Sequence, residues 1–450
     1  MKKSKTVIGD EGIYDARELG APKMLILGFQ HMFAMFGATI LVPALTGLSV
    51  SATLLFAGLG TLLFHLISKG KVPAFLGSSF AFLAGYWAIA PNKEPELLPY
   101  ACFGVACAGL VYVILSGLFK IFGPQKVMRF FPPIVTGPVI ICIGLTLSST
   151  AVSSCSSNWW IALVAIAVVI ICNIFGKGMI KIIPILLGVI ASYLVAALSG
   201  NVDFKTVADA AWLGWPFQWQ NTVFGIFSGK VDTGLLITAV ITIVPISIAT
   251  IIEHIGDICA ISSTCEKNYV EDPGLHRTLL GDGLATSFAA MFGAPANTTY
   301  GENTGVLALS KVYDPRVIRI AACIAVLFSF SPKFAALISC MPTATLGGIS
   351  LVLYGMISAV GVRNVVENRV DFAKSRNVLI AALIMVLAIG IRFGTGDAQG
   401  ILFQVGSATI NLSGLAVASI VGIVLNAVLP GKDYVFGTDV KGDTSVSFKV

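Results

Sequence analysis

The stretch that decides the fold is residues 297–311, NTTYGENTGVLALSK. Its second half has the apolar character of a membrane helix, whereas its first half gathers amides, hydroxyls and the carboxylate of Glu302 close behind Pro295. A non-helical stretch at membrane depth is tolerated only where protein buries it or where it lines a water-filled cavity. The stretch therefore predicts an interrupted membrane span whose backbone amides are free to bind a ligand.

The whole chain has the composition of an all-α polytopic membrane protein. Of its 450 residues, 56% are hydrophobic and 12% are charged, which is about half the charged fraction of a soluble domain. Its mean hydropathy is +0.89. About 20 apolar residues cross a hydrocarbon core, and the hydropathy pattern predicts fourteen transmembrane segments, near 25–46, 50–68, 73–92, 99–119, 131–150, 159–175, 179–198, 232–256, 278–293, 297–310, 317–332, 334–358, 377–394 and 410–430.

The positions of the Lys and Arg residues test that count. With the N-terminus inside, 24 of the 29 basic residues fall in inner loops or tails, and the outer side keeps Lys93, Lys205, Lys230, Lys333 and Arg392. Basic residues gather on the cytoplasmic side of membrane proteins, and a missed span would invert every later loop. The distribution predicts fourteen spans with both termini cytoplasmic. The net charge of +6 then gives no reason to expect a nucleic-acid partner.

The two halves of the chain resemble each other weakly. Residues 131–147, FPPIVTGPVIICIGLTL, match 341–357, MPTATLGGISLVLYGMI, and the third and tenth spans share a proline followed by small and polar residues (PAFLGSSFAF, 73–82; GAPANTTYGEN, 293–303). Equivalent spans are seven apart, so the second copy crosses the membrane in the opposite sense, as in inverted-repeat transporters. We expect two inverted repeats of seven spans, with short extended strands in spans 3 and 10. Kinked helices with Ser and Thr bonded to their own backbone are the alternative.

Four acids lie inside predicted spans. Glu253 and Asp257 are four residues apart and share a helical face, and Asp282 and Glu302 follow in the next two spans. Each charged side chain costs about 3 kcal/mol at a helix centre on insertion scales. One reading is structural, with His254 as the nearest cationic partner or Asp282 as a helix cap. The other is that these acids exchange protons and accept hydrogen bonds from a small planar solute that carries N–H groups.

Other polar residues fit a structural role. Gln30 and His31 stand in an otherwise apolar segment and, with Asn303, predict a buried hydrogen-bond network; direct contact of His31 with a ligand is the alternative. The nine Cys residues lie mostly in apolar segments, without a CxxC motif or a Cys/His cluster. We therefore expect no metal site, no cofactor and no disulfide framework.

At these residues the chain resembles the nucleobase/ascorbate transporter family, and most closely its uracil permease branch. The resemblance covers nearly the whole chain and rests on QHMFAMFGATILVP (30–43), PAFLGSSFAF (73–82), IIEHIGD (251–257), EDPGLHR (271–277), NTTYGENTGVLALSKVY (297–313) and GGISLVLYGMI (347–357). The family signature begins with an acid, Gln or Pro before Asn-x-Gly. Here Glu302 holds the first position, as in the uracil branch, and Ser310 replaces the usual Thr.

The resemblance implies a core domain formed by spans 1–4 and 8–11 and a gate domain formed by spans 5–7 and 12–14. In this chain the core is expected at 24–120 and 232–320, and the gate at 121–200 and 321–430, with span 11 at the boundary. The resemblance also implies the roles of the site residues. Glu253 and Glu302 would hold the nucleobase, the pocket would be completed by Phe80, Tyr300, Gly301 and the region of Ala38, and the proton would be carried by Glu253, Asp257, Asp282 and Glu302.

The function expected from this resemblance is proton-coupled import of uracil for pyrimidine salvage, in the cytoplasmic membrane. A homodimer through the gate domain and contact with membrane lipid are implied with it. Asp257 stands where some uracil transporters have His, which leaves its role and the substrate preference open. Xanthine or another nucleobase, Na⁺ coupling, and an anion exchanger of the same fold are the alternatives. A membrane-embedded enzyme is less favoured, because four scattered His residues form no ligand or nucleophile motif.

Overall fold

The computed structural model describes residues 12–177, 179–229, 231–396, 399–405, 408–432 and 434. Within these ranges, the side chains of residues 36–38, 179, 182, 302, 405, 408 and 409 are outside the description. The elements are η1 (Ala16–Leu19), α1 (Ala21–Thr46), α2 (Val50–Ile67), β1 (Leu76–Ser78), α3 (Leu83–Ile89), α4 (Leu98–Phe122), α5 (Pro124–Met128), α6 (Pro133–Cys155), α7 (Trp159–Phe175), α8 (Met179–Ile182), α9 (Pro184–Leu198), α10 (Lys205–Asp209), η2 (Trp219–Asn221), α11 (Val223–Ile226), α12 (Thr233–Ile243), η3 (Val244–Ile246), α13 (Ser247–Thr264), η4 (Val270–Gly274), α14 (Leu275–Met291), β2 (Asn297–Thr299), α15 (Gly301–Ser310), α16 (Pro315–Ser329), α17 (Pro332–Ser339), α18 (Thr343–Glu367), α19 (Ser375–Gly394), β3 (Gly400–Val405), β4 (Ala408–Ser413) and α20 (Gly414–Val428).

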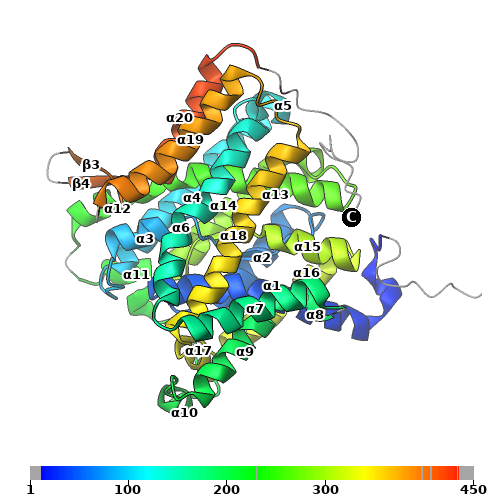
Figure 1. Ribbon diagram of the computed structural model, residues 1–450, viewed down its shortest axis with the longest axis vertical. Coiled ribbons are helices and arrows are strands. Elements are labelled where there is room, and N and C mark those ends of the chain that lie inside the picture. The colour runs from blue at the N-terminus through cyan, green and yellow to red at the C-terminus, as the bar shows by residue number, and fades with distance from the viewer. Residues whose placement is uncertain are drawn as a thin grey trace, which may run out of the picture.

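Long apolar helices make the chain a multi-pass membrane protein (Figure 1). Seven helices of the described part are long and apolar enough to cross a membrane: α1, α2, α4, α6, α12 continued into α13, α18 and α19. The consecutive helices α16 and α17 pass the same test together, although the chain bends by 88° between them, and α7, α9 and α20 are shorter apolar helices. These helices coincide with predicted spans, whereas the total of fourteen crossings stays a prediction.

Two segments differ from the sequence-based expectation. The span predicted at 334–358 is broken, because α17 ends at Ser339 and α18 starts only at Thr343, behind Pro342. Proline at the start of a helix lacks the N–H that would continue the preceding one. Before the last helix, β3 and β4 form an antiparallel hairpin, so the description all-α was wrong there and α20 begins at Gly414. The alternation of apolar and polar residues in 408–413, ATINLS, suits a strand.

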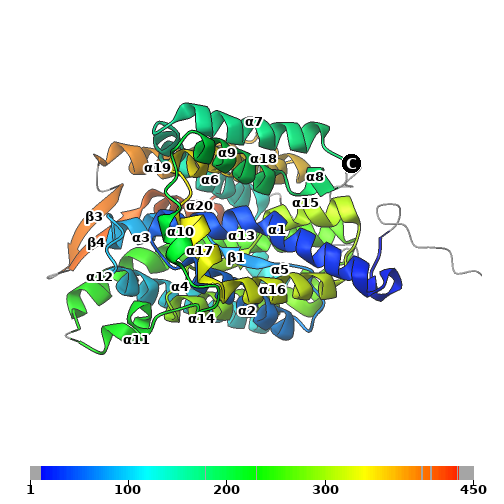
Figure 2. The same ribbon diagram turned by 90° about the horizontal axis from the view of Figure 1, so that it is seen from below.

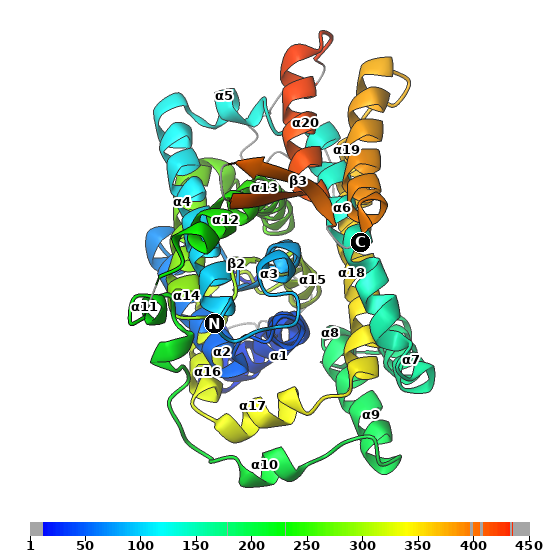
Figure 3. The same ribbon diagram turned by 90° about the vertical axis from the view of Figure 1, so that its left-hand side faces the viewer.

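The helices pack as two sets with a central layer between them. The first helix set consists of α2, α4, α12, α14 and α16, in which α4 packs on α14 and α2 packs on α16. The second helix set consists of α6, α7, α9, α18, α19 and α20, in which α6 packs on α18 and α7 on α9. Figure 3 shows the sets on opposite sides, and Figure 2 shows α1, α13 and α15 between the outer layers. The central layer therefore meets both sets.

The two interrupted spans meet inside the molecule. β1 pairs with β2 in antiparallel sense, with Gly77 opposite Thr298, and all six residues are buried. Side chains fix both strands from outside: the hydroxyl of Thr61 accepts from the Leu76 N–H at 2.9 Å, and the hydroxyl of Thr286 donates to the Asn297 carbonyl at 2.6 Å. These bonds satisfy backbone groups that hydrocarbon leaves unpaired. The prediction of short antiparallel strands in spans 3 and 10 is confirmed.

Candidate binding site

Each strand of the β1–β2 pair is followed by a helix that starts inside the protein. α15 begins at Gly301, directly behind β2, and α3 begins at Leu83, a few residues behind β1. The first N–H groups of a helix have no partner within it and form the positive end of the helix dipole. Because the strands are antiparallel, the two helices leave their crossing in opposite senses. The crossing therefore lies at the N-terminal ends of two helices, whose dipoles favour a ligand that accepts hydrogen bonds.

Tyr300 covers the strand crossing. Its hydroxyl donates to the carbonyl of Ser78 at 3.2 Å and lies 3.4 Å from the hydroxyl of Thr39 on α1. A Cβ placed on Gly77 would lie 2.4 Å from the Tyr300 ring, so only glycine admits the ring at this position. Since the Tyr300 side chain is buried, it forms one wall of the crossing and ties β1, β2 and α1 together.

Carboxylates of α13 and α14 converge on β2. The hydroxyl of Thr299 donates to Asp257 Oδ2 at 3.1 Å and lies 3.3 Å from His254 Nδ1. The same His254 nitrogen lies 2.8 Å from Asp282 Oδ2, and both side chains are fully buried. A Cβ added to Gly301 would lie 2.9 Å from Asp257 Oδ1. Asp257, His254 and Asp282 thus form a connected polar cluster that ends at the first residue of α15.

The remaining predicted acids lie at the edge of this cluster. Glu253 is half-buried on α13, one turn before Asp257 and on the same face. Glu302 is the second residue of α15, and its side chain lies outside the described part of the chain. Ala38 belongs to α1, and its side chain is likewise outside the description. Of the acids of α13, the structure brings Asp257 to the first residue of α15.

The predicted network residues also come together. His31 Nδ1 lies 2.9 Å from Asn303 Oδ1, and Asn303 donates from Nδ2 to the carbonyl of Pro73 at 2.9 Å. His31 and Asn303 have no exposed surface. Gln30, which precedes His31 in the sequence, is also buried. The network joins α1, α15 and the segment that leads into β1, so it fixes the helix that carries Glu302.

Phe80 faces an aromatic residue from the second helix set that sequence reasoning missed. The rings of Phe80 and Tyr354, on α18, meet edge to face with their centroids 5.4 Å apart. Both side chains are buried. Tyr354 stands in the quoted stretch 347–357, where its repeat counterpart is Gly144, and a Cβ on Gly144 would lie 2.1 Å from the Tyr354 carbonyl oxygen. The sequence signal that could have drawn attention to Tyr354 is that it aligns with a glycine in the other copy of the predicted repeat.

Solved transporter structures share the overall arrangement. The transmembrane domain of the bicarbonate transporter BicA of a cyanobacterium superposes with a TM-score of 0.61 at 14% identity, covering 92% of this chain and 99% of that one. The structure of SLC26A9 superposes with a TM-score of 0.63 at 12% identity, covering 92% of this chain and 66% of that one. At such identities the likeness concerns the fold alone.

Several bacterial permeases are more similar to this chain in sequence than these solved structures are. The uracil permease of Bacillus caldolyticus is 42% identical over 417 residues, covering 91% of this chain and 92% of that protein. The uracil permease of Bacillus subtilis strain 168 is 38% identical over 445 residues, covering 96% and 97%, and that of Escherichia coli K12 is 35% identical over 420 residues, covering 89% and 90%. Permeases are transporters and not enzymes. The model of the Permease family, Xan_ur_permease, matches residues 22–396, and with the multi-pass helices and the resemblance drawn from the motifs this makes the chain a member of that family.

Proposed function

We propose that this permease imports uracil by proton symport. One observation carries the proposal: at the point where β2 ends and α15 begins, the hydroxyl of Thr299 donates to the carboxylate of Asp257, and a Cβ added to Gly301 would lie against the same carboxylate. An acid of α13 therefore stands beside the first turn of α15. The uracil permeases among its relatives make uracil the first substrate to test.

The ligand would bind between α13 and the two half-helices. Uracil is planar and uncharged and carries ring N–H groups beside carbonyl oxygens. Ionised Glu253 and Glu302 would accept from the N–H groups, and the backbone near Phe80, Tyr300 and Gly301, with the region of Ala38 on α1, would serve the carbonyl oxygens. Phe80 would lie against the ring, because aromatic faces and edges pack well on flat solutes.

The proton would be held by the carboxylates of the same cluster. Glu253, Asp257, Asp282 and Glu302 are the candidate carriers, and His254 connects Asp282 to Thr299. A carboxyl group that gains a proton changes from acceptor to donor, so protonation changes how tightly the ring N–H groups are held. One charge that crosses 100 mV supplies about 2.3 kcal/mol, which is about fifty-fold accumulation.

The packing supports two inverted repeats of seven spans. If each span is replaced by its counterpart seven spans away, the contact of α4 with α14 corresponds to the contact of α16 with α2. The contact of α7 with α9 corresponds in the same way to the contact of α19 with α20. All four pairs are in contact. The pairs α6–α18 and β1–β2 each join a span to its own counterpart. We accordingly propose the core at 24–120 and 232–320 and the gate at 121–200 and 321–430. The core would move against the gate during transport.

Contacts between loops support fourteen spans with both termini cytoplasmic. Loops assigned to the inner side touch one another: Tyr14 donates to the Cys265 carbonyl at 2.9 Å, and Lys71 lies 2.5 Å from Asp272. Loops assigned to the outer side do the same, since the Gly214 N–H donates to the Phe330 carbonyl at 3.0 Å. The cytoplasmic membrane is the proposed location.

The second helix set offers a surface for a homodimer or for lipid. Large apolar side chains of α7 and α9 are exposed, among them Trp160, Ile174, Phe175 and Leu198. Exposed apolar patches of this kind mark contacts with lipid or protein. We propose that a second copy covers part of this surface and that membrane lipid covers the rest.

Uptake into proteoliposomes tests the proposal. Labelled uracil is supplied with and without an inward proton gradient, and unlabelled uracil, xanthine, hypoxanthine and thymine compete for uptake. The expected result is gradient-driven accumulation that uracil blocks best and that Glu253→Gln abolishes. Equal uptake with the gradient collapsed would show that transport is not coupled to protons. A requirement for Na⁺ would show that Na⁺ is the coupling ion instead. Stronger competition by xanthine assigns the site to another nucleobase.

A further inference from the structure

Arg392 is a buried cation that the proposed transport cycle does not use. Its position in the sequence predicts the outer side of the membrane, and its side chain on α19 is only 7% exposed. Its Nε donates to the carbonyl of Thr146 on α6 at 3.3 Å, and its guanidinium lies 5.8 Å from the ring centroid of Trp87. Nη1 has no hydrogen-bond partner among the described residues. A guanidinium is always charged and has five N–H donors, so among the described residues this one has fewer acceptors than donors.

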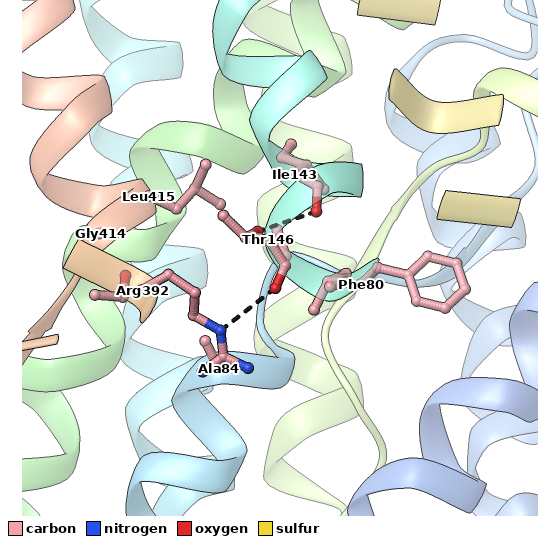
Figure 4. A pocket seen from close by; sticks show the side chains of 10 residues that line it. Phe80, Ala84, Ile143, Thr146, Arg392, Gly414 and Leu415 are labelled. Carbon is pink, nitrogen blue, oxygen red and sulfur yellow. Dashed lines mark hydrogen bonds between the residues drawn. The ribbon is translucent and has the colours of Figure 1, made fainter. Parts of the chain in front are cut away.

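A small cavity lies at the guanidinium. Its volume is about 20 Å³, which is room for one water-sized particle and far too little for a nucleobase. No Asp or Glu of the described chain lines it; the lining residues are Phe80, Ala81, Ala84, Ile143, Thr146, Leu147, Arg392, Ser413, Gly414 and Leu415. Figure 4 shows the Arg392 side chain reaching between the Thr146 carbonyl and Ala84. The cavity thus combines a positive charge that no carboxylate lining it in the described chain compensates with space for one small particle.

The start of α20 faces the same cavity. Gly414 and Leu415 are the first two residues of this 15-residue helix, and the first N–H groups of a helix lack acceptors within it. Ser413 caps the helix by accepting from the Ala416 N–H, which leaves the two earlier N–H groups available. A Cβ on Gly414 would lie 2.5 Å from the Ala388 carbonyl oxygen and 3.2 Å from the backbone nitrogen of Arg392, so glycine lets α20 start directly against the backbone of α19. Two positive features therefore meet at one point.

We propose that this cavity is a binding site for a small monovalent inorganic anion, with chloride as the physiological case. Helix N-termini bind anions through their free N–H groups and the helix dipole, and hydrogen bonds from Arg to an anion are charge-assisted. The anion compensates the buried charge of Arg392 and joins α19, α20 and α6 to α3. The site is separate from the acids of α13 and does not depend on the proposed substrate or on proton coupling.

Thermal unfolding of the purified full chain in sodium chloride and in sodium gluconate, at equal ionic strength, tests the site without substrate. Chloride raises the unfolding temperature of the wild type in a saturable manner, because an anion that binds only the folded state stabilises it. Arg392→Gln removes that dependence, or weakens chloride binding by about ten- to a hundredfold. Arg392→Lys keeps a charge and retains a weakened response.

Arg376→Gln is the matched control. Arg376 lies on the same helix, but its guanidinium already donates to Asn426 Oδ1 at 2.7 Å and to Asn377 Oδ1 at 3.1 Å, so this variant keeps the full chloride response. Crystals soaked in sodium bromide give a second readout, with an anomalous peak expected at Arg392 Nη1. A wild type that unfolds at the same temperature in both salts, an unchanged response in Arg392→Gln, or the absence of bromide from the cavity each overturns the proposal.

Discussion

The imidazole Nδ1 of His254 lies 2.8 Å from a carboxylate oxygen of Asp282, and neither side chain has any exposed surface. The two residues come from α13 and α14, and the Thr299 hydroxyl of β2 lies 3.3 Å from the same nitrogen. Three elements of the binding site therefore depend on one buried contact. The sequence offered His254 as the nearest cationic group for the acids, but the partner it takes is the acid of the next span.

Removal of one partner from this pair should be costly. Asp282→Leu leaves His254 buried without its acceptor, and loss of one member of a buried pair costs about 3–5 kcal/mol. Asp282→Asn keeps an amide oxygen at the same place and should lose less. The free energy of unfolding in detergent measures both, and uracil uptake in proteoliposomes shows whether the remaining folded protein still transports.

An exposed acid provides the comparison for Asp282. Asp272 lies 2.5 Å from Lys71, but its side chain is 68% exposed, and exposed ion pairs contribute at most about 1 kcal/mol. Asp272→Asn should therefore unfold close to the wild type. If Asp282→Leu is as stable as Asp272→Asn, the buried pair does not stabilise the site.

Gly301 controls the distance between α15 and the acids of α13. Gly301→Ala places a methyl group 2.9 Å from Asp257 Oδ1, which pushes the carboxylate or the first turn of α15 out of place. A misplacement of binding groups by about 1 Å can cost tenfold or more in affinity or rate. We expect at least about a tenfold rise in the KM for uracil, measured as initial uptake rates over a range of uracil concentrations.

Gly305→Ala is the control on the same helix, one turn later. A Cβ at Gly305 meets no atom within 4 Å, and alanine is the better helix former by about 1 kcal/mol. Gly305→Ala should leave the KM unchanged and the helix slightly more stable. Equal KM values for the two variants would show that Asp257 does not need the space beside Gly301.

Gly77 admits the Tyr300 ring to the strand crossing. A Cβ at Gly77 would lie 2.4 Å from that ring, so Gly77→Ala should destabilise the fold by about 1–3 kcal/mol, as overpacking of a core does. Tyr300→Ala removes the clash, and the double variant should unfold at nearly the temperature of Tyr300→Ala alone. Gly117→Ala, on α4 with open space around it, controls for the exchange itself. Additive losses in the double variant would contradict the contact.

Local patterns in the sequence predicted the elements, while contacts between distant residues had to come from the structure. The strands of spans 3 and 10 were predictable because prolines and small polar residues interrupt apolar runs at matching places. Arg392 was assigned to the outer side from its place near the end of the span predicted at 377–394, and its burial against α6 and α20 depends on residues distant in the sequence. His31 and Asn303 were predicted as members of one buried network from their polarity, whereas the bond that joins them across 272 positions is not fixed by any periodicity within either segment. The contact of Tyr354 with Phe80 likewise joins residues far apart in the sequence, because α18 packs there against the segment between β1 and α3.

The N-terminal segment is held by a buried acid whose loss should be felt. Asp314, which is 3% exposed, accepts from the Ala16 N–H at 2.7 Å and from the Arg316 N–H at 2.9 Å, so it both fixes the segment and caps α16. Asp314→Ala leaves both donors unpaired and should cost about 2 kcal/mol or more.

Asp15, in the same N-terminal segment, is the acid used for comparison with Asp314, because its side chain is reached by solvent. The hydrogen bond from Arg17 holds the pKa of Asp15 below its ordinary value of 3.8, so its contribution is present above that pH and is lost as the pH falls further. Because Asp15 is solvated, Asp15→Ala should barely change unfolding at pH 7. Thermal unfolding of both variants at pH 7 measures the difference, and equal losses would mean that the segment is held by its surface charges and not by Asp314.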